Sequence, residues 1–269
     1  MPETVYAGPD ALYALVDSAQ NHIHREPWHC VAARHGLPYR SLFEGTLEEN
    51  LIDMAPLLIA MPGPGPAREQ AIALHLSLAK TATGLSWLAS PLELGALWAH
   101  LRRFHSVRAD DGSRSHIRYY DTRVLPEWWS VLTPQQRQVF FDRISHWQYH
   151  DRAGILCALP LNELCPAADG AALLVLSERQ VADLIERSMA DSIAMQLPSG
   201  VGSDLNAQEI HDRIAVELSL LRAQGITDLE TTRVRCTFAV QHELDDGKRP
   251  VLGIADMAQA TEMTEEKHV

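Results

Sequence analysis

The first 150 or so residues alternate short apolar runs with helical patterns, and this alternation constrains the fold more than any other feature. Short apolar runs bounded by turn residues predict buried strands at 12–19, 39–45 and 55–61. Helical spacing predicts one helix at 26–36, between the first two strands, and another near 67–80, after the third strand. Strands that alternate with helices are typical of crossover connections. We therefore expect an α/β domain with a mixed, mostly parallel sheet flanked by helices.

Two capping boxes and one hairpin signal extend this prediction. Thr46 with Glu49, and Asn206 with Glu209, fit the box in which each side chain satisfies a free backbone donor at a helix start. The first box predicts a helix over 46–54. Two extended runs between 105 and 125 surround an Asp-Gly turn, which favours a β-hairpin at an antiparallel edge of the sheet.

The rest of the chain has a different pattern. Residues 160–176 lose periodicity and contain prolines and a glycine, which is typical of a linker. Residues 177–247 carry three amphipathic helical patterns, and 248–269 form a polar tail. The predicted organisation is an α/β domain over 1–159, a linker, and a small all-helical C-terminal lobe.

The charge distribution limits the class of partner. A formal net charge of -12 argues against general nucleic-acid binding, which needs many phosphate-neutralising cations. Six arginines nevertheless fall close together in the sequence: Arg102, Arg103, Arg108, Arg114, Arg118 and Arg123. Guanidinium groups hold carboxylates in fixed geometry and stack on aromatic rings, so such a cluster suits protein contacts. A solvated surface with local ion pairs is the alternative interpretation.

Three features favour a cytoplasmic protein. The N-terminus lacks the basic start and long apolar run of a signal peptide. The apolar runs are far shorter than the roughly 18 residues that indicate a membrane span. Cys30, Cys157, Cys165 and Cys236 form no C-x-x-C pair, and in a chain of this length they are most simply buried thiols in a reducing compartment.

Motifs for cofactor, metal and nucleophile chemistry are missing. No G-x-S-x-G elbow or P-loop lysine motif occurs, and prolines at 62, 64 and 66 remove the backbone donors that a phosphate needs. His22, His24, His29 and Cys30 are dense enough to suggest zinc, but their spacing matches no standard site. We predict no metal and no cofactor.

The carboxylates offer weak catalytic candidates. Asp17 ends the first predicted strand, where capping or core pairing is a better interpretation than catalysis. In IRYYDTRVL, at 117–125, a strand would place Asp121 and Arg123 on one face as an ion pair. Arg118 and Tyr120 would lie on the opposite face and contact a helix or a partner. Nearby arginines lower the pKa expected for Asp121, which makes it a poor general base.

Several motifs occur together in an order that resembles one known family. They are LPYRSLFEGT (37–46), DMAPLLIAM (53–61), SPLELGALWAHLRRFHSVRADDGS (90–113), IRYYDTRVL, LTPQQRQVFF (132–141) and LLRAQGITDLE (220–230). The set resembles the type VI secretion effector chaperone and adaptor family, long catalogued only as a domain of unknown function. The likeness covers roughly 11–158 well and the helical lobe loosely. The chain departs from the family's R-F-Y-D-P-R pattern at Tyr119 and Thr122.

The resemblance implies a cytoplasmic adaptor without catalytic activity. Such an adaptor holds a secreted effector protein, usually by the effector's N-terminal region, and helps load it onto the VgrG spike protein. We expect no nucleic-acid partner and no membrane partner. Arg102, Arg103, Arg118 and Tyr120 are the expected partner contacts. An α/β enzyme using Asp17 or Asp121, or an immunity protein that neutralises a toxin, are the alternatives.

Overall fold

The computed structural model describes residues 5–6, 8–21, 26–79, 82–110, 112–163 and 174–242. The chain divides into two compact units, residues 1–187 and 188–269, and the division falls inside helix α6 (Glu178–Ala194). Of the sequence predictions, the polar tail at 248–269, most of the linker at 160–176, His22, His24 and Cys165 lie outside the described residues.

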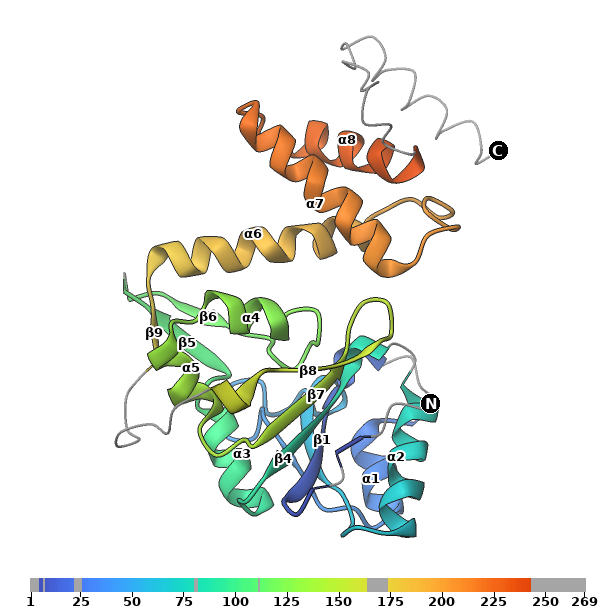
Figure 1. The fold of residues 1–269 in the computed structure, drawn as a ribbon, viewed down its shortest axis with the longest axis vertical. Coiled ribbons are helices and arrows are strands. Elements are labelled where there is room, and N and C mark those ends of the chain that lie inside the picture. Colours follow the sequence, from blue (N-terminus) through green and yellow to red (C-terminus); the bar gives the residue numbers. More distant parts are fainter. Residues whose placement is uncertain are drawn as a thin grey trace. The chain divides into compact units, whose positions relative to one another are not determined.

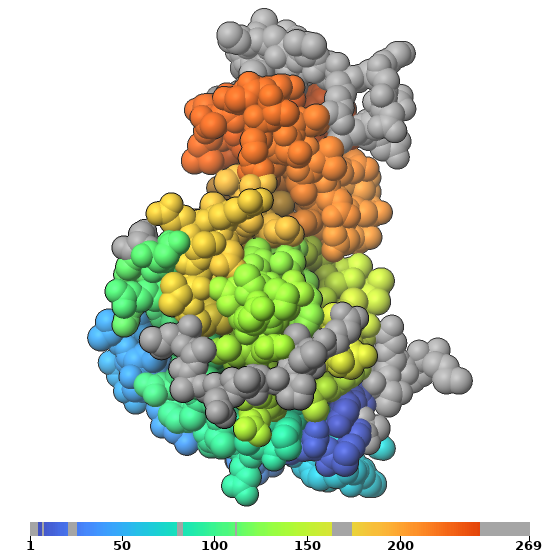
Figure 2. All heavy atoms as spheres, turned by 60° about the vertical axis from the view of Figure 1, so that its left-hand side comes forward, coloured from blue at the N-terminus to red at the C-terminus, as the bar shows by residue number. Residues whose placement is uncertain are grey.

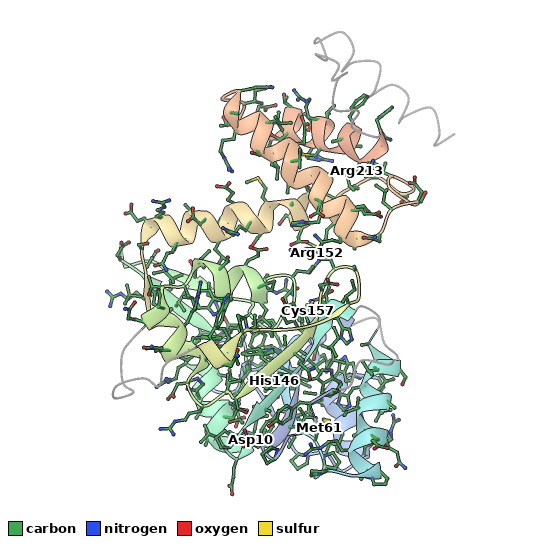
Figure 3. All side chains as sticks on the ribbon, in the orientation of Figure 1. Asp10, Met61, His146, Arg152, Cys157 and Arg213 are labelled. Atoms are coloured by element: carbon green, nitrogen blue, oxygen red, sulfur yellow. The ribbon has the colours of Figure 1, made fainter. Side chains whose placement is uncertain are left out.

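The first unit is built on a six-stranded sheet with the order β2-β3-β1-β4-β7-β8 (Figure 1). The strands are β1 (Ala11–Asp17), β2 (Tyr39–Ser41), β3 (Pro56–Ala60), β4 (Leu85–Ser90), β7 (His146–His150) and β8 (Leu156–Ala158). Figure 3 labels His146 on β7 and Cys157 on β8, the two strands at one edge.

The prediction of a mostly parallel sheet is wrong, because all five pairs of neighbouring strands in this sheet are antiparallel. The crossovers themselves were expected: β1 and β2 run in the same direction across α1 (Trp28–Arg34), and β3 and β4 do so across α2 (Pro66–Leu78). However, β3 lies between β1 and β2, and β1 lies between β3 and β4. Alternating elements predict the direction of successive strands but not which strands are neighbours, and here each parallel pair is separated by an antiparallel strand.

Helices cover both faces of this sheet. On one face lie α1 (Trp28–Arg34) and α2 (Pro66–Leu78), and on the other lie α3 (Leu94–Arg102), α4 (Leu125–Val131) and α5 (Pro134–Phe141). Strand β1 serves both cores, because Leu12, Ala14 and Val16 face α1 and α2 while Tyr13 and Leu15 face the other side. A strand buried on both faces is apolar throughout, which explains why its sequence shows no alternation.

A second, three-stranded sheet has the order β6-β5-β9. Strands β5 (Ser106–Ala109) and β6 (Arg114–His116) form the antiparallel hairpin that the Asp-Gly turn predicted. Strand β9 (Val175–Leu176) adds to β5 in parallel. This small sheet carries two arginines of the cluster, Arg108 on β5 and Arg114 on β6.

The two predicted capping boxes have different outcomes. Asn206 and Glu209 form theirs and begin α7 (Ala207–Ala223). Thr46 does not: its hydroxyl donates to the Phe43 carbonyl at 2.7 Å and accepts from the Glu48 amide at 3.2 Å. The hydroxyl therefore closes a local turn, a competing use that is common for threonine. Residues 46–50 stay irregular, and one short 3₁₀ helix, η2 (Ile52–Met54), follows.

The second unit contains the last part of α6, α7 (Ala207–Ala223) and α8 (Leu229–Gln241). An Asn206–Glu209 capping box begins α7. Arg213, labelled in Figure 3, donates from Nη1 to the Val240 and His242 carbonyls at 3.2 Å, so it ties α7 to the end of α8. No helix among the described residues combines the length and apolar character that crossing a membrane would need.

The cysteines are less buried than expected. Cys236 is fully buried in the second unit's core, whereas Cys30 and Cys157 are only partly buried. All three are free thiols. The prediction of buried thiols is therefore correct for Cys236 alone among the three described cysteines.

Candidate functional site

The segment IRYYDTRVL forms a series of turns, so the prediction of a strand there is wrong. Strand β6 ends at His116, and residues 119–124 follow as turns. Asp121 causes the change, because its Oδ1 atom accepts from the Arg123 amide at 3.0 Å. An aspartate that bonds the backbone two residues onward favours a turn over an extended strand.

The same turn brings the Arg123 guanidinium onto the Asp121 carboxylate. The Nε atom of Arg123 donates to Oδ1 at 3.0 Å and its Nη2 atom donates to Oδ2 at 2.7 Å. Asp121 is 2% exposed. A bidentate, buried arginine–aspartate pair fixes local geometry. The two residues are close because of the turn, not because they share a strand face.

Asp17, at the end of β1, joins the same network. Its carboxylate accepts from the Ala19 amide at 3.2 Å, from Gln20 at 3.0 Å and from Nη2 of Arg118 at 2.7 Å. It is 0% exposed, and burial raises its pKa, an effect that Arg118 partly offsets. The Asp17–Arg118 contact joins the central strand to the turn, and these contacts suit a structural role.

Tyr120 and Arg118 were expected to contact a helix or a partner. The Tyr120 ring is 5% exposed, and burial raises its pKa to about 12. The Arg118 guanidinium lies 6.0 Å from the ring centroid of Tyr120, and its side chain is 44% exposed. Arg118 therefore spans the network and the surface, whereas Tyr120 belongs to the core.

Arg102 and Arg103 occupy a different place, at the C-terminal end of α3. Arg102 donates from Nη2 to the Gly45 carbonyl at 2.8 Å, and Arg103 is exposed. Both line a pocket of about 550 Å³ that lies between α3, the β5–β6 hairpin and β9. Its lining residues are Thr46, Ala99, Arg102, Arg103, Phe104, His105, Ser106, Val107, Arg108, Arg114, Leu174 and Val175.

Charge in this pocket is of one sign. Arg108 and Arg114 pair directly across the hairpin, so their side chains leave the same face of the sheet. Together with Arg102 and Arg103 they make four arginines, and the described residues of the lining include no aspartate or glutamate. Among the described residues, no carboxylate forms an ion pair with any of the four. We call this feature the arginine pocket. A concave surface lined by one sign of charge concentrates the field and attracts opposite charge.

Exposed apolar side chains occur in the segment that contributes Thr46 to the pocket. Leu47 is 98% exposed, Leu51 52% and Met54 46%. All three lie in 46–54, the segment that does not form the predicted helix. In Figure 2 the green hairpin and the light-blue chain around residue 45 both lie at the surface of the first unit. Apolar side chains beside arginines are the usual composition of a protein-binding surface.

The histidines weighed for zinc do not form a site within the described residues. His29 lies in α1, with Nε2 at 3.2 Å from the Cys30 sulfur and Nδ1 at 3.6 Å from Asp53. His22 and His24 lie outside the described residues. His146 and His150 lie at the two ends of β7.

Comparison with known proteins identifies one domain. Residues 12–139 match the family model described as a domain of unknown function, DUF4123. A DUF4123 domain spans these residues. No curated protein and no solved structure was found to match the chain.

The DUF4123 domain holds nearly all of the arginine pocket, since every lining residue except Leu174 and Val175 lies within 12–139. It also holds the Asp17–Arg118–Asp121–Arg123 network. Sequence reasoning selected Arg102 and Arg103 as partner contacts but left Arg108 and Arg114 as members of a charge cluster. The predicted hairpin could have identified Arg108 and Arg114 as a pair, because the hairpin register places them opposite each other.

Proposed function

We propose that the protein is a cytoplasmic chaperone or adaptor that binds a type VI secretion effector and helps load it onto the VgrG spike protein, without catalysis. The DUF4123 domain and the ordered set of motifs support the family role. The observation that carries the binding role is the arginine pocket, which gathers four arginines without a described carboxylate partner in a chain of net charge -12.

Charge and exposure determine which partner segment would fit. An acidic segment would neutralise the guanidinium groups of Arg103, Arg108 and Arg114, and apolar side chains of that segment would cover Leu47. Electrostatic attraction would speed the encounter and orient the partner. The N-terminal region of the effector is the segment that we expect to bind.

The contacts of the two buried carboxylates support a role without catalysis. Asp17 and Asp121 are 0% and 2% exposed, and arginine side chains bond both. A general base must come within hydrogen-bond reach of a substrate proton. An enzyme using either residue would lose turnover in Asp121→Asn while keeping its fold, whereas the adaptor hypothesis expects this variant to lose stability.

Co-purification tests the proposal. The full chain, co-expressed with an effector encoded beside its gene, should be recovered in a stable complex with that effector. Deletion of the gene for this protein should reduce the solubility and the secretion of the effector. Recovery of the protein alone, with effector secretion unchanged in the deletion strain, would contradict an adaptor role. An immunity protein would instead protect cells from the effector's toxicity, so a toxicity assay with and without this protein separates the two.

A further inference from the structure

We propose that Glu48, His105 and His116 bind a divalent transition-metal ion, with Zn²⁺ as the preferred ion. Each of the three side chains offers one ligand atom, and these atoms all lie within 4.8 Å of one another. The three residues belong to the first unit and to the DUF4123 domain, but none of the sequence motifs predicted them as ligands. The inference does not depend on the proposed adaptor function.

The hairpin brings the two histidines together. His116 pairs with Ser106 across β5 and β6, and the Ile117 amide donates to the His105 carbonyl at 3.1 Å. As a result the two rings meet edge to face with centroids 4.6 Å apart. Glu48 reaches them from the turns after β2, with Oε1 3.5 Å from Nε2 of His116 and Oε2 3.8 Å from Nε2 of His105.

His105 supplies the second, independent sign of a ligand. It is 5% exposed, and neither of its ring nitrogens has a hydrogen-bond partner among the residues that the structure describes. The 3.8 Å separation from Glu48 is too long for a hydrogen bond. Buried polar atoms in proteins nearly always have a partner, and an orphaned one calls for an explanation such as a missing ion. A metal ion between His105 and Glu48 would satisfy one ring nitrogen directly.

The donor set selects the class of ion. Two imidazoles with one carboxylate are a common ligand set for zinc and for other first-row transition metals, whereas calcium and magnesium prefer oxygen ligands alone. Binding would draw the three atoms inward to roughly 2.0–2.2 Å from the ion. Three protein ligands leave one tetrahedral position for water or for a group from a partner.

The position of the site suggests what the ion would do. Glu48 lies two residues after Thr46, and both His105 and Thr46 line the arginine pocket. A bound ion would therefore tie the irregular 46–50 segment to the β5–β6 hairpin and fix one wall of the pocket. The pocket's arginines repel a cation, so we expect a weaker site than a four-ligand structural zinc site.

Metal titration of the full chain tests this proposal. After treatment with a chelator, the protein is titrated with Zn²⁺ in competition with a metal indicator, and with Co²⁺ by its visible absorption. We expect one ion per chain, and affinity reduced at least roughly tenfold in both Glu48→Gln and His116→Ala. The His116 side chain is 55% exposed, so its replacement should leave the fold intact, which circular dichroism checks.

The matched control is His35→Ala, which removes an exposed histidine at the end of α1. It should bind the ion like the wild type. The proposal is overturned if Glu48→Gln and His116→Ala bind Zn²⁺ as tightly as the wild type, or if His35→Ala weakens binding equally, since surface histidines alone would then explain uptake. A negative result in the metal titration does not affect the co-purification experiment, so the metal site and the adaptor function are tested separately.

Discussion

Arg108 and Arg114 are directly opposed across the β5–β6 hairpin, and both line the same pocket. Opposed like charges in an antiparallel pair destabilise the pair. Neither arginine has a carboxylate partner among the described residues. Repulsion between the two guanidinium groups therefore destabilises the free protein, and an acidic partner would offset this repulsion. This relationship is the basis of the binding role proposed above.

The first prediction separates stability from binding. Arg108→Gln removes one of the two opposed charges, so the free energy of unfolding should stay the same or rise by about 0.2–1 kcal/mol. The affinity for the effector should fall in the same variant. Urea unfolding and binding titration measure the two effects. A destabilisation above about 1 kcal/mol would mean that Arg108 has a structural role instead.

The second prediction concerns the Asp121–Arg123 pair. Asp121→Asn leaves the guanidinium of Arg123 without its charged partner in a largely buried place, so the variant should lose about 3 kcal/mol of stability. Asp110→Asn is the matched control, because Asp110 is exposed on the hairpin. It should change stability by less than about 0.5 kcal/mol. Equal stability of Asp121→Asn and the wild type would contradict a structural role.

The third prediction is a pH dependence centred on His75. This side chain is 1% exposed, is stacked on Trp28 at 5.4 Å, and has its Nδ1 atom 2.7 Å from the Ala71 carbonyl oxygen. Burial lowers its pKa below the usual 6.5. Below that pH the unfolded chain binds a proton that the folded chain does not. Stability should therefore be fully present above pH 6.5 and decrease as the pH falls through and below that value.

His75→Phe provides the check on this assignment. The variant keeps an aromatic ring beside Trp28 but cannot be protonated, so its stability should decrease less steeply below pH 6.5. One histidine contributes at most about 1.4 kcal/mol per pH unit to the slope of the free energy of unfolding against pH. His100 also has a lowered pKa because of burial, and part of the slope should remain. An unchanged slope in His75→Phe would exclude His75 as the source.

The fourth prediction is a salt dependence of partner binding. Arg103, Arg108 and Arg114 are exposed, so their attraction for an acidic segment is screened by ions. The association rate should fall as the salt concentration rises, while the dissociation rate should change less. Stopped-flow or biosensor kinetics at several salt concentrations measure both rates. Binding that strengthens with salt would indicate an apolar interface in place of the arginine pocket.

Local features were predicted from the sequence better than relations between distant segments. The Asn206–Glu209 box and the 105–116 hairpin were recognised because each depends on a few neighbouring residues. The neighbours of β1 were not, since the position of β1 between β3 and β4 depends on long-range pairing. Thr46 was misassigned because its hydroxyl serves a turn as readily as a helix start.

The site was predicted only in part for the same reason. The arginine cluster was visible as composition, and Arg102 and Arg103 were chosen from it. Arg118 belongs instead with Asp17, a residue 101 positions away in the sequence. Glu48, His105 and His116 are likewise separated in sequence, and their meeting depends on the hairpin register and on a turn that the sequence had indicated as a helix.

The central claim is tested most directly by the affinity of the full chain for its effector after charge reversal in the arginine pocket. The variant carries Arg103→Glu, Arg108→Glu and Arg114→Glu, and the control carries Arg34→Glu on α1, across the sheet from the pocket. We predict at least a tenfold loss of affinity, about 1.4 kcal/mol, for the pocket variant and no loss for the control. Equal affinity of the folded pocket variant and the wild type would contradict the account.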